Sequence, residues 1–132
     1  MTKPLYIKQC KGKGRGVFCK QVIIKEELIE SAPLIIIPAA QKAWVMESKL
    51  TDYFFNYCET EDALALALGF GSLYNHAEHS NADYRIDYDN RQIDFFALED
   101  IPTGREICIN YGGAYGKDYR NWFEDRNIPY QK

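Results

Sequence analysis

Short apolar or alternating segments, separated by turn residues, run through most of this 132-residue chain and restrict it to a β-rich fold. The alternation is clearest where Tyr84, Ile86 and Tyr88 are interleaved with polar residues, before residues 89–91 turn the chain into residues 92–98. This pattern predicts a β-hairpin. Further strands are expected over five short apolar segments, residues 5–7, 17–19, 22–24, 34–37 and 107–111.

Helical patterns are few. Residues 60–68 fit a short helix capped at Thr60, but their alternating Ala and Leu fit a buried strand nearly as well. Residues 117–126 space Tyr119, Trp122 and Phe123 by three and four, which predicts a short amphipathic helix. The chain is therefore expected to be mainly β with short helices, in one domain over residues 1–132.

Composition narrows the class of protein. A chain with 46% hydrophobic and 14% aromatic residues can bury an independent core. It has no apolar run long enough for a membrane span and no signal peptide at its start. We therefore expect a soluble intracellular protein, cytoplasmic or, in a eukaryote, nuclear. The four cysteines are too scattered for a metal site or a disulfide framework, so we interpret them as reduced thiols.

Charge is distributed unevenly along the chain. Residues 1–50 carry nine Lys/Arg against four Asp/Glu, whereas residues 51–132 carry seven against fifteen. Between residues 52 and 100, eleven carboxylates face only Arg85 and Arg91. Such a cluster steers cationic partners toward a protein, although a merely solvated acidic face gives the same pattern.

Two stretches, residues 73–81 and 106–112, place polar side chains in apolar surroundings. Asn75 and His76 each donate and accept hydrogen bonds, and Tyr111 ends an apolar strand before two glycines. Buried polar groups need partners, so these stretches indicate a ligand or an internal network. His76 and His79 alone are too few ligands for a metal site.

The basic, glycine-rich residues 11–16 suit either an anion cradle or an ordinary hairpin turn. They match neither the Walker phosphate loop nor the dinucleotide fingerprint. Five basic residues between Lys8 and Lys20 would suit nucleic acid, but the acidic remainder of the chain argues against direct binding.

Three segments, taken in order, resemble the SET-domain protein methyltransferases. Residues 14–18 resemble the first family motif, residues 74–76 with Asn81 resemble its Asn-His motif, and residues 104–107 with Tyr111 and Gly112 resemble its closing motif. The resemblance covers residues 5–123. It implies a SET-type β-clip of several small sheets with short helices, in which the segment ending at Tyr111 makes a knot-like arrangement.

The resemblance also implies a function, namely transfer of a methyl group from S-adenosyl-L-methionine to lysine in a basic, histone-like or other protein. Tyr111 would be the catalytic phenol, and Tyr84, Tyr53 and Phe54 would line the lysine channel. The residues implied for binding the donor are Lys13, Gly14 and Arg15 at its methionine end, Asn75 and His76 near its adenine, and Trp122 stacked on that ring.

Some features differ from the family pattern. Ser31 stands where many members have a channel tyrosine. The zinc-binding flanks of many members are absent, so we expect no zinc and assign closure of the site to residues 113–132. A homodimer stays open. The alternative from a different class is a non-catalytic SET-like module that binds basic peptides.

Overall fold

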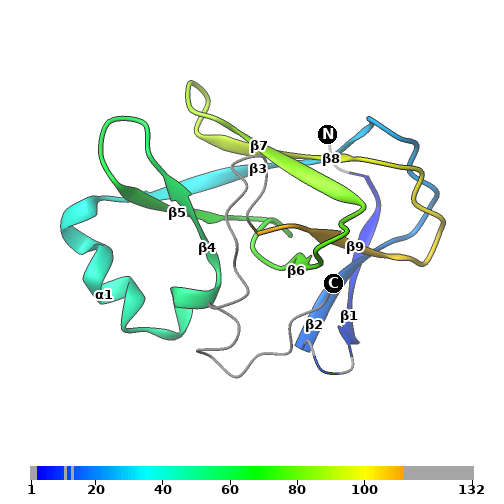
Figure 1. Cartoon of the computed structure of the whole chain (residues 1–132), viewed down its shortest axis with the longest axis horizontal. Helices are drawn as coiled ribbons and strands as arrows, with labels where there is room; N and C mark the ends of the chain where they lie inside the picture. Colours follow the sequence, from blue (N-terminus) through cyan, green and yellow to red (C-terminus); the bar gives the residue numbers. More distant parts are fainter. Residues whose placement is uncertain (1–2, 11, 13, 112–132) are drawn as a thin grey trace.

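Strands are the main secondary structure of the computed structural model, which describes residues 3–10, 12 and 14–111 (Figure 1). The strands are β1 (Leu5–Cys10), β2 (Gly14–Cys19), β3 (Leu28–Ile37), β4 (Phe54–Tyr57), β5 (Ala63–Ala67), β6 (Asn75–His76), β7 (Ala82–Asp87), β8 (Gln92–Ala97) and β9 (Glu106–Ile109). The helical elements are short: η1 (Ala39–Gln41), α1 (Lys42–Met46) and η2 (Lys49–Asp52). The mainly β prediction is confirmed.

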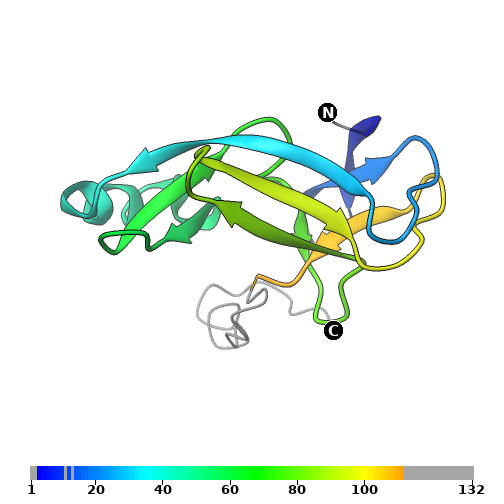
Figure 2. The same ribbon diagram turned by 90° about the horizontal axis from the view of Figure 1, so that it is seen from above.

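The strands pair in the order β1-β2-β9-β7-β8-β3-β5-β4, and β6 pairs with β9 outside this path. Ten-residue β3 joins two groups, since its first half pairs with β8 and residues 34–37 pair with β5. In Figures 1 and 2, β1 and β2 lie at one end of the molecule, and α1 lies at the other. This order places β9 between the N-terminal hairpin and the β7–β8 hairpin.

The predicted β7–β8 hairpin is confirmed, with Tyr84 opposite Phe95 and Ile86 opposite Ile93. The strand predicted over residues 22–24 is wrong. Only Ile23 pairs there, in an isolated bridge to Ile101, with a bend at residues 20–21 before it and a turn at residues 25–26 after it. Glu26 within that turn has a φ of 73°, a left-handed conformation that ends an extended segment.

For residues 60–68 the strand alternative is confirmed and the helix is wrong, because β5 pairs on both edges, with β3 and with β4. Strand β3 begins six residues before the predicted segment. Glu30 and Ser31 interrupt the apolar pattern of its first half and hid this part of the strand. Pro33 lies at its last pair with β8, just before the pairing with β5 begins. The helix predicted over residues 117–126 lies outside the described residues.

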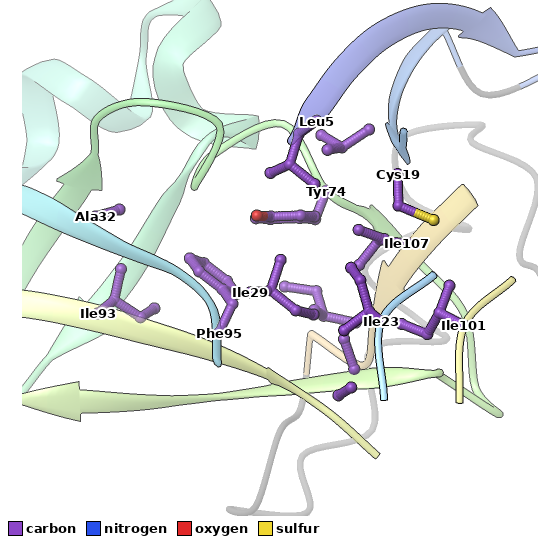
Figure 3. Packing of buried hydrophobic residues seen from close by; sticks show 14 of the residues in the cluster. Leu5, Cys19, Ile23, Ile29, Ala32, Tyr74, Ile93, Phe95, Ile101 and Ile107 are labelled. Carbon is purple, nitrogen blue, oxygen red and sulfur yellow. The ribbon is translucent and has the colours of Figure 1, made fainter. Parts of the chain in front are cut away.

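Inward-facing side chains of most strands form the main core (Figure 3). Tyr74 and Phe95 lie at its centre with ring centroids 4.5 Å apart. Among the described residues, the buried polar side chains are those of Glu30 and His76, which are 3% and 4% exposed. Each therefore needs a specific internal partner.

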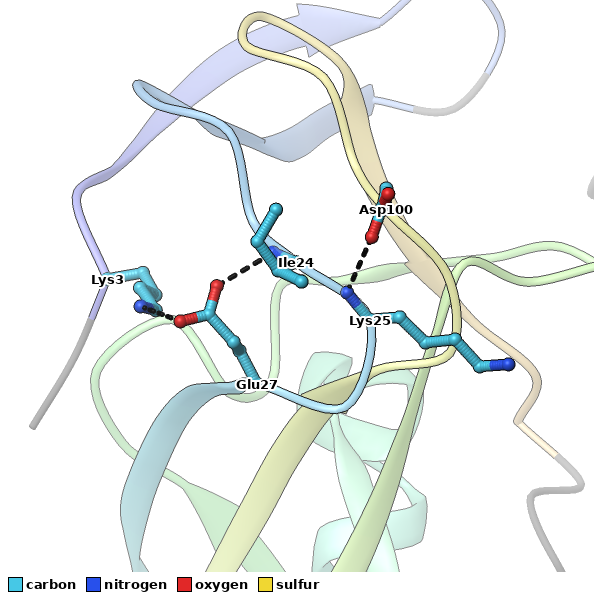
Figure 4. A network of polar contacts seen from close by, with 5 residues as sticks. All are labelled: Lys3, Ile24, Lys25, Glu27 and Asp100. Carbon is cyan, nitrogen blue, oxygen red and sulfur yellow. Dashed lines mark hydrogen bonds and ion pairs between the residues drawn. The ribbon is translucent and has the colours of Figure 1, made fainter.

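A polar network holds the turn before β3 (Figure 4). The Glu27 carboxylate accepts from the Ile24 backbone N–H at 2.7 Å and pairs with Lys3 Nζ at 2.9 Å. Asp100 Oδ1 accepts from the Lys25 backbone N–H at 2.8 Å. Because the Ile24 N–H favours the charged form, with Lys3 adding to it, the pKa of Glu27 lies below its ordinary value.

Candidate active site

The two polar stretches of the sequence meet where β6 runs parallel to β9. Asn75 lies opposite Cys108 and His76 lies opposite Ile109. The backbone N–H of Ala77 continues the pairing by donating to the Ile109 carbonyl at 3.0 Å. This junction places Asn75, His76 and Tyr111 in one region although about 35 residues of sequence separate them.

Tyr111 is held at three separate atoms. Its backbone N–H donates to His76 Nδ1 at 3.0 Å, and its carbonyl accepts from Tyr84 Oη at 3.3 Å. Its own phenol donates to the Tyr74 carbonyl at 3.0 Å. The ring centroids of His76 and Tyr111 lie 5.1 Å apart. The phenol oxygen is therefore fixed in position before any substrate binds, which favours catalysis.

Burial raises the pKa of Tyr111. The nearby Cys108, Tyr53 and Asp52 raise it further, because in their ionised forms they repel the negative charge of a phenolate. The phenol is therefore protonated at neutral pH. A neutral hydroxyl with a fixed orientation donates and accepts hydrogen bonds without placing a full charge in the site.

His76 is neutral for two reasons. Its Nδ1 accepts from the Tyr111 backbone N–H, which leaves the ring proton on Nε2. Burial also lowers the pKa of His76, and the negative charge of Glu78 opposes that shift without cancelling it. The imidazole therefore serves as a fixed acceptor that holds the Tyr111 backbone.

The burial of His76 predicts that the free energy of unfolding depends on pH. Below pH 6.5 the unfolded chain protonates His76 while the folded chain resists protonation, so the free energy of unfolding should decrease with falling pH. We expect His76→Gln to weaken this decrease. Burial raises the pKa of Glu30, so this residue makes the free energy of unfolding increase as the pH falls toward 4.5, opposite to His76. The informative quantity is therefore the difference in the free energy of unfolding between wild type and variant.

Urea unfolding at several pH values between 5 and 8 measures this difference. Above pH 7.5 the histidine is neutral in both states, and the two curves should run parallel there. Equal slopes in wild type and His76→Gln below pH 6.5 would contradict the assigned role of burial.

Asn75 joins the junction to the glycine-rich N-terminal hairpin. Its Nδ2 donates to Glu106 Oε2 at 2.7 Å and to the Arg15 carbonyl at 3.2 Å. Gly16 leaves no room for a side chain, because a Cβ there would collide with Glu106, Cys10 and Asn75. The segments predicted to bind the donor thus lie together as far as residues 14, 15, 75 and 76. Lys13 and Trp122, and residues 113–132, lie outside the described residues.

Aromatic side chains gather beside Tyr111. Tyr84 packs edge-on against Phe55, with centroids 5.1 Å apart, and Tyr53 lies near enough to affect the Tyr111 pKa. Side chains alternate along β4, so Phe54 faces away from the side on which Phe55 meets Tyr84. The channel roles of Tyr84, Tyr53 and Phe54 stay predictions.

Ser31, which stands where many family members have a channel tyrosine, donates to Asp94 Oδ1 at 2.7 Å.

Sequence reasoning assigned no role to two residues that shape this region. The Asn81 side chain bonds to the Glu106 carbonyl and to the Cys108 N–H of β9. The buried Glu30 carboxylate accepts from the Tyr74 hydroxyl. Asn81 was visible in the sequence as part of the segment that resembles the Asn-His motif. An acidic residue within an apolar segment was the signal for Glu30.

Two absences concern the described part of the chain. No group of three or more His, Cys, Asp or Glu side chains there is arranged to hold a metal ion. None of its helices has the length and apolar character needed to cross a membrane.

Comparisons with known proteins show the family of this chain. A SET domain family model matches residues 14–112. The histone-lysine N-methyltransferase, H3 lysine-37 specific, of Schizosaccharomyces pombe is 34% identical over 126 residues, which cover 95% of this chain and 80% of that protein. A solved structure of a Plasmodium falciparum protein that is named as a histone methyltransferase is 30% identical to this chain, with a TM-score of 0.71. The match covers 89% of this chain and all of that one.

A more distant likeness extends to a much larger assembly. The complex ctPRC2, solved in an autoinhibited conformation bound to S-adenosylmethionine, has a chain that is 20% identical with a TM-score of 0.73. That match covers all of this chain and 18% of the other, and it concerns the fold alone. The family match and the 34% identical relative together define the chain as a one-carbon transferase. The chain belongs to the SET-domain family, and it is a protein-lysine N-methyltransferase.

Proposed function

We propose that this enzyme transfers a methyl group from S-adenosyl-L-methionine to a lysine side chain of a basic protein, with histones as the first candidates. The observation that carries the proposal is the junction of β6 and β9, which holds the Tyr111 phenol beside Asn75 and His76. The relative from Schizosaccharomyces pombe, named for lysine 37 of histone H3, supports the choice of histones.

The residues around Asn75 suit the methyl donor. Asn75 is partly exposed, and none of the hydrogen bonds made by the described residues uses its Oδ1, so this oxygen can accept from the donor's amino groups. The backbone of Gly14 and Arg15 lies beside it and offers close approach. When bound, the donor supplies a methyl group on a sulfonium sulfur, so attack by an amine forms the N–C bond and breaks the C–S bond.

The acceptor lysine must be neutral to attack, since its ordinary pKa is about 10.4. Desolvation among aromatic side chains lowers that pKa. The neutral Tyr111 phenol also avoids the full negative charge that would hold the ammonium form. We assign Tyr111 Oη to orient the amine, and Tyr84 and Tyr53 to line its path; Phe54 faces the other side of β4 and is left out of this assignment. The leaving proton passes to solvent.

Charge supports a basic substrate. The acidic stretch of residues 52–100 includes the last residue of η2, strands β4 to β8 and the turns between these strands. Several of its carboxylates, such as Glu59, Asp89 and Glu99, are exposed. A negative surface raises the encounter rate with a cationic partner and loses this effect at high salt.

The test is incubation with tritiated donor and a histone mixture, followed by amino-acid analysis for methyl-lysine. Methyl transfer to histones should exceed transfer to an acidic protein that contains lysine, and added salt should reduce the difference. Binding of a lysine peptide without turnover, measured by calorimetry with donor present, would replace the enzyme with the non-catalytic alternative.

A further inference from the structure

Glu30 is a buried carboxylate that the proposed reaction does not use directly. The register between β3 and β8 shifts between Leu28 and Glu30, so the consecutive residues Ile29 and Glu30 are both buried. Ordinary strand alternation would send one of them to solvent. A β-bulge at this point therefore turns the Glu30 carboxylate into the core, as bulges do where they redirect a side chain.

The two oxygens of Glu30 hold two points of the turn that leads from β5 to β6. Oε2 accepts from the Phe70 backbone N–H at 2.9 Å, and Oε1 accepts from Tyr74 Oη at 2.7 Å. Gly69 has a φ of 60°, and a Cβ there would collide with the carboxylate. The turn and the carboxylate are thus fitted to each other, with Tyr74 fixed at its far end.

Tyr74 connects this anchor to the catalytic phenol. Its side chain is 2% exposed and packs on Phe95, while its backbone carbonyl accepts from Tyr111 Oη at 3.0 Å. Tyr74 is therefore held by its phenol at Glu30 and by its ring at Phe95, and it presents its carbonyl to Tyr111. The bonds that Glu30 makes among the described residues go to Phe70 and Tyr74, so it reaches Tyr111 through Tyr74.

We propose that Glu30 is a positioning residue for methyl transfer, which fixes Tyr74 so that the Tyr74 carbonyl orients the Tyr111 hydroxyl. The proposal rests on the proposed function for the role of Tyr111. The geometric coupling from Glu30 through Tyr74 to Tyr111 stands on the contacts alone. It assigns to a carboxylate in β3 an influence on kcat that a purely structural residue would not have.

The experiment compares Tyr74→Phe, Glu30→Ala and Glu30→Gln in the full chain. Tyr74→Phe keeps the ring on Phe95 and removes only the hydroxyl bonded to Glu30, so the protein should stay folded. We expect its kcat to decrease by about 10-fold to 100-fold, since small misplacements at a reacting centre have effects of this size. The Kd for S-adenosyl-L-methionine should change little. Glu30→Gln keeps hydrogen-bonding groups toward Phe70 and Tyr74 and should retain more of kcat than Glu30→Ala.

A double variant and a control separate positioning from stability. If Glu30 acts through Tyr74, then Glu30→Ala with Tyr74→Phe should be no slower than the slower single variant. Ser72→Ala removes a bond to the Ala67 N–H in the same turn, at 3.1 Å, and should lower Tm without lowering kcat. A kcat that stays at the wild-type value in Tyr74→Phe, or that decreases as much in Ser72→Ala, overturns the proposal.

A second readout works without turnover. In protein labelled with [13Cζ]tyrosine, the Tyr111 resonance, identified by its loss in Tyr111→Phe, should shift in Tyr74→Phe and stay in place in Ser72→Ala. If wild type transfers no methyl group but this shift occurs, the proposed function fails and the coupling stands. If wild type is active and the resonance does not move, the coupling fails and the proposed function stands.

Discussion

Tyr111→Phe is expected to decrease kcat for lysine methylation by about 100-fold to 1,000-fold, the size of loss seen when one fixed hydrogen-bonding group is removed from an active site. The change deletes the hydroxyl that bonds to the Tyr74 carbonyl. It leaves the other two contacts intact, because His76 and Tyr84 bond to the Tyr111 backbone. The variant should therefore fold and bind the donor, and single-turnover transfer with tritiated donor measures the loss.

Tyr57→Phe is a matched control for this variant. Tyr57 is a buried tyrosine of β4 whose phenol donates to the Tyr88 carbonyl at 3.5 Å, within a second, smaller core cluster. Its kcat should stay close to that of the wild type. Methyl transfer that survives both Tyr111→Phe and Tyr111→Ala would remove the catalytic role assigned to this phenol.

The sequence predicts most reliably what depends on neighbouring residues. The β7–β8 hairpin follows from alternation and turn residues. For β5 the alternating Ala and Leu left helix and strand open, and only the pairing on both edges decides for the strand. Residues 75, 76 and 111 were recognised as polar groups in apolar segments. Their adjacency depends on a parallel pairing between two strands far apart in sequence, so it came from the family resemblance and not from periodicity.

What the sequence could not predict depends on tertiary contacts. Ile23 lies in an apolar run that is typical of a strand, yet in the structure it pairs only through a single bridge to Ile101. Glu30 breaks the apolar pattern of β3, and its burial is favourable because the bulge turns it inward and because the Tyr74 hydroxyl and the Phe70 N–H both bond to its carboxylate. In each case a partner about 40 or more residues away in sequence decides the local structure.

Asn81→Ala is expected to decrease the free energy of unfolding by about 2–4 kcal/mol, because it leaves two backbone groups of β9 without their partner. The Asn81 side chain donates to the Glu106 carbonyl at 2.9 Å and accepts from the Cys108 N–H at 2.9 Å. It thus bonds to β9 as a neighbouring strand would, just before β7 meets β9 at the pair Ala82 and Ile109. Urea unfolding measures the loss.

The same loosening of β9 should reach the active site, since β9 carries Glu106 and leads directly to Tyr111. We expect kcat of Asn81→Ala to decrease even at temperatures where the variant is fully folded. Asn90→Ala, in the exposed turn of the β7–β8 hairpin, removes a bond to Asp87 and is the matched control, with an expected loss below about 1 kcal/mol. Equal losses of stability in the two variants would show that Asn81 does not hold β9 in place.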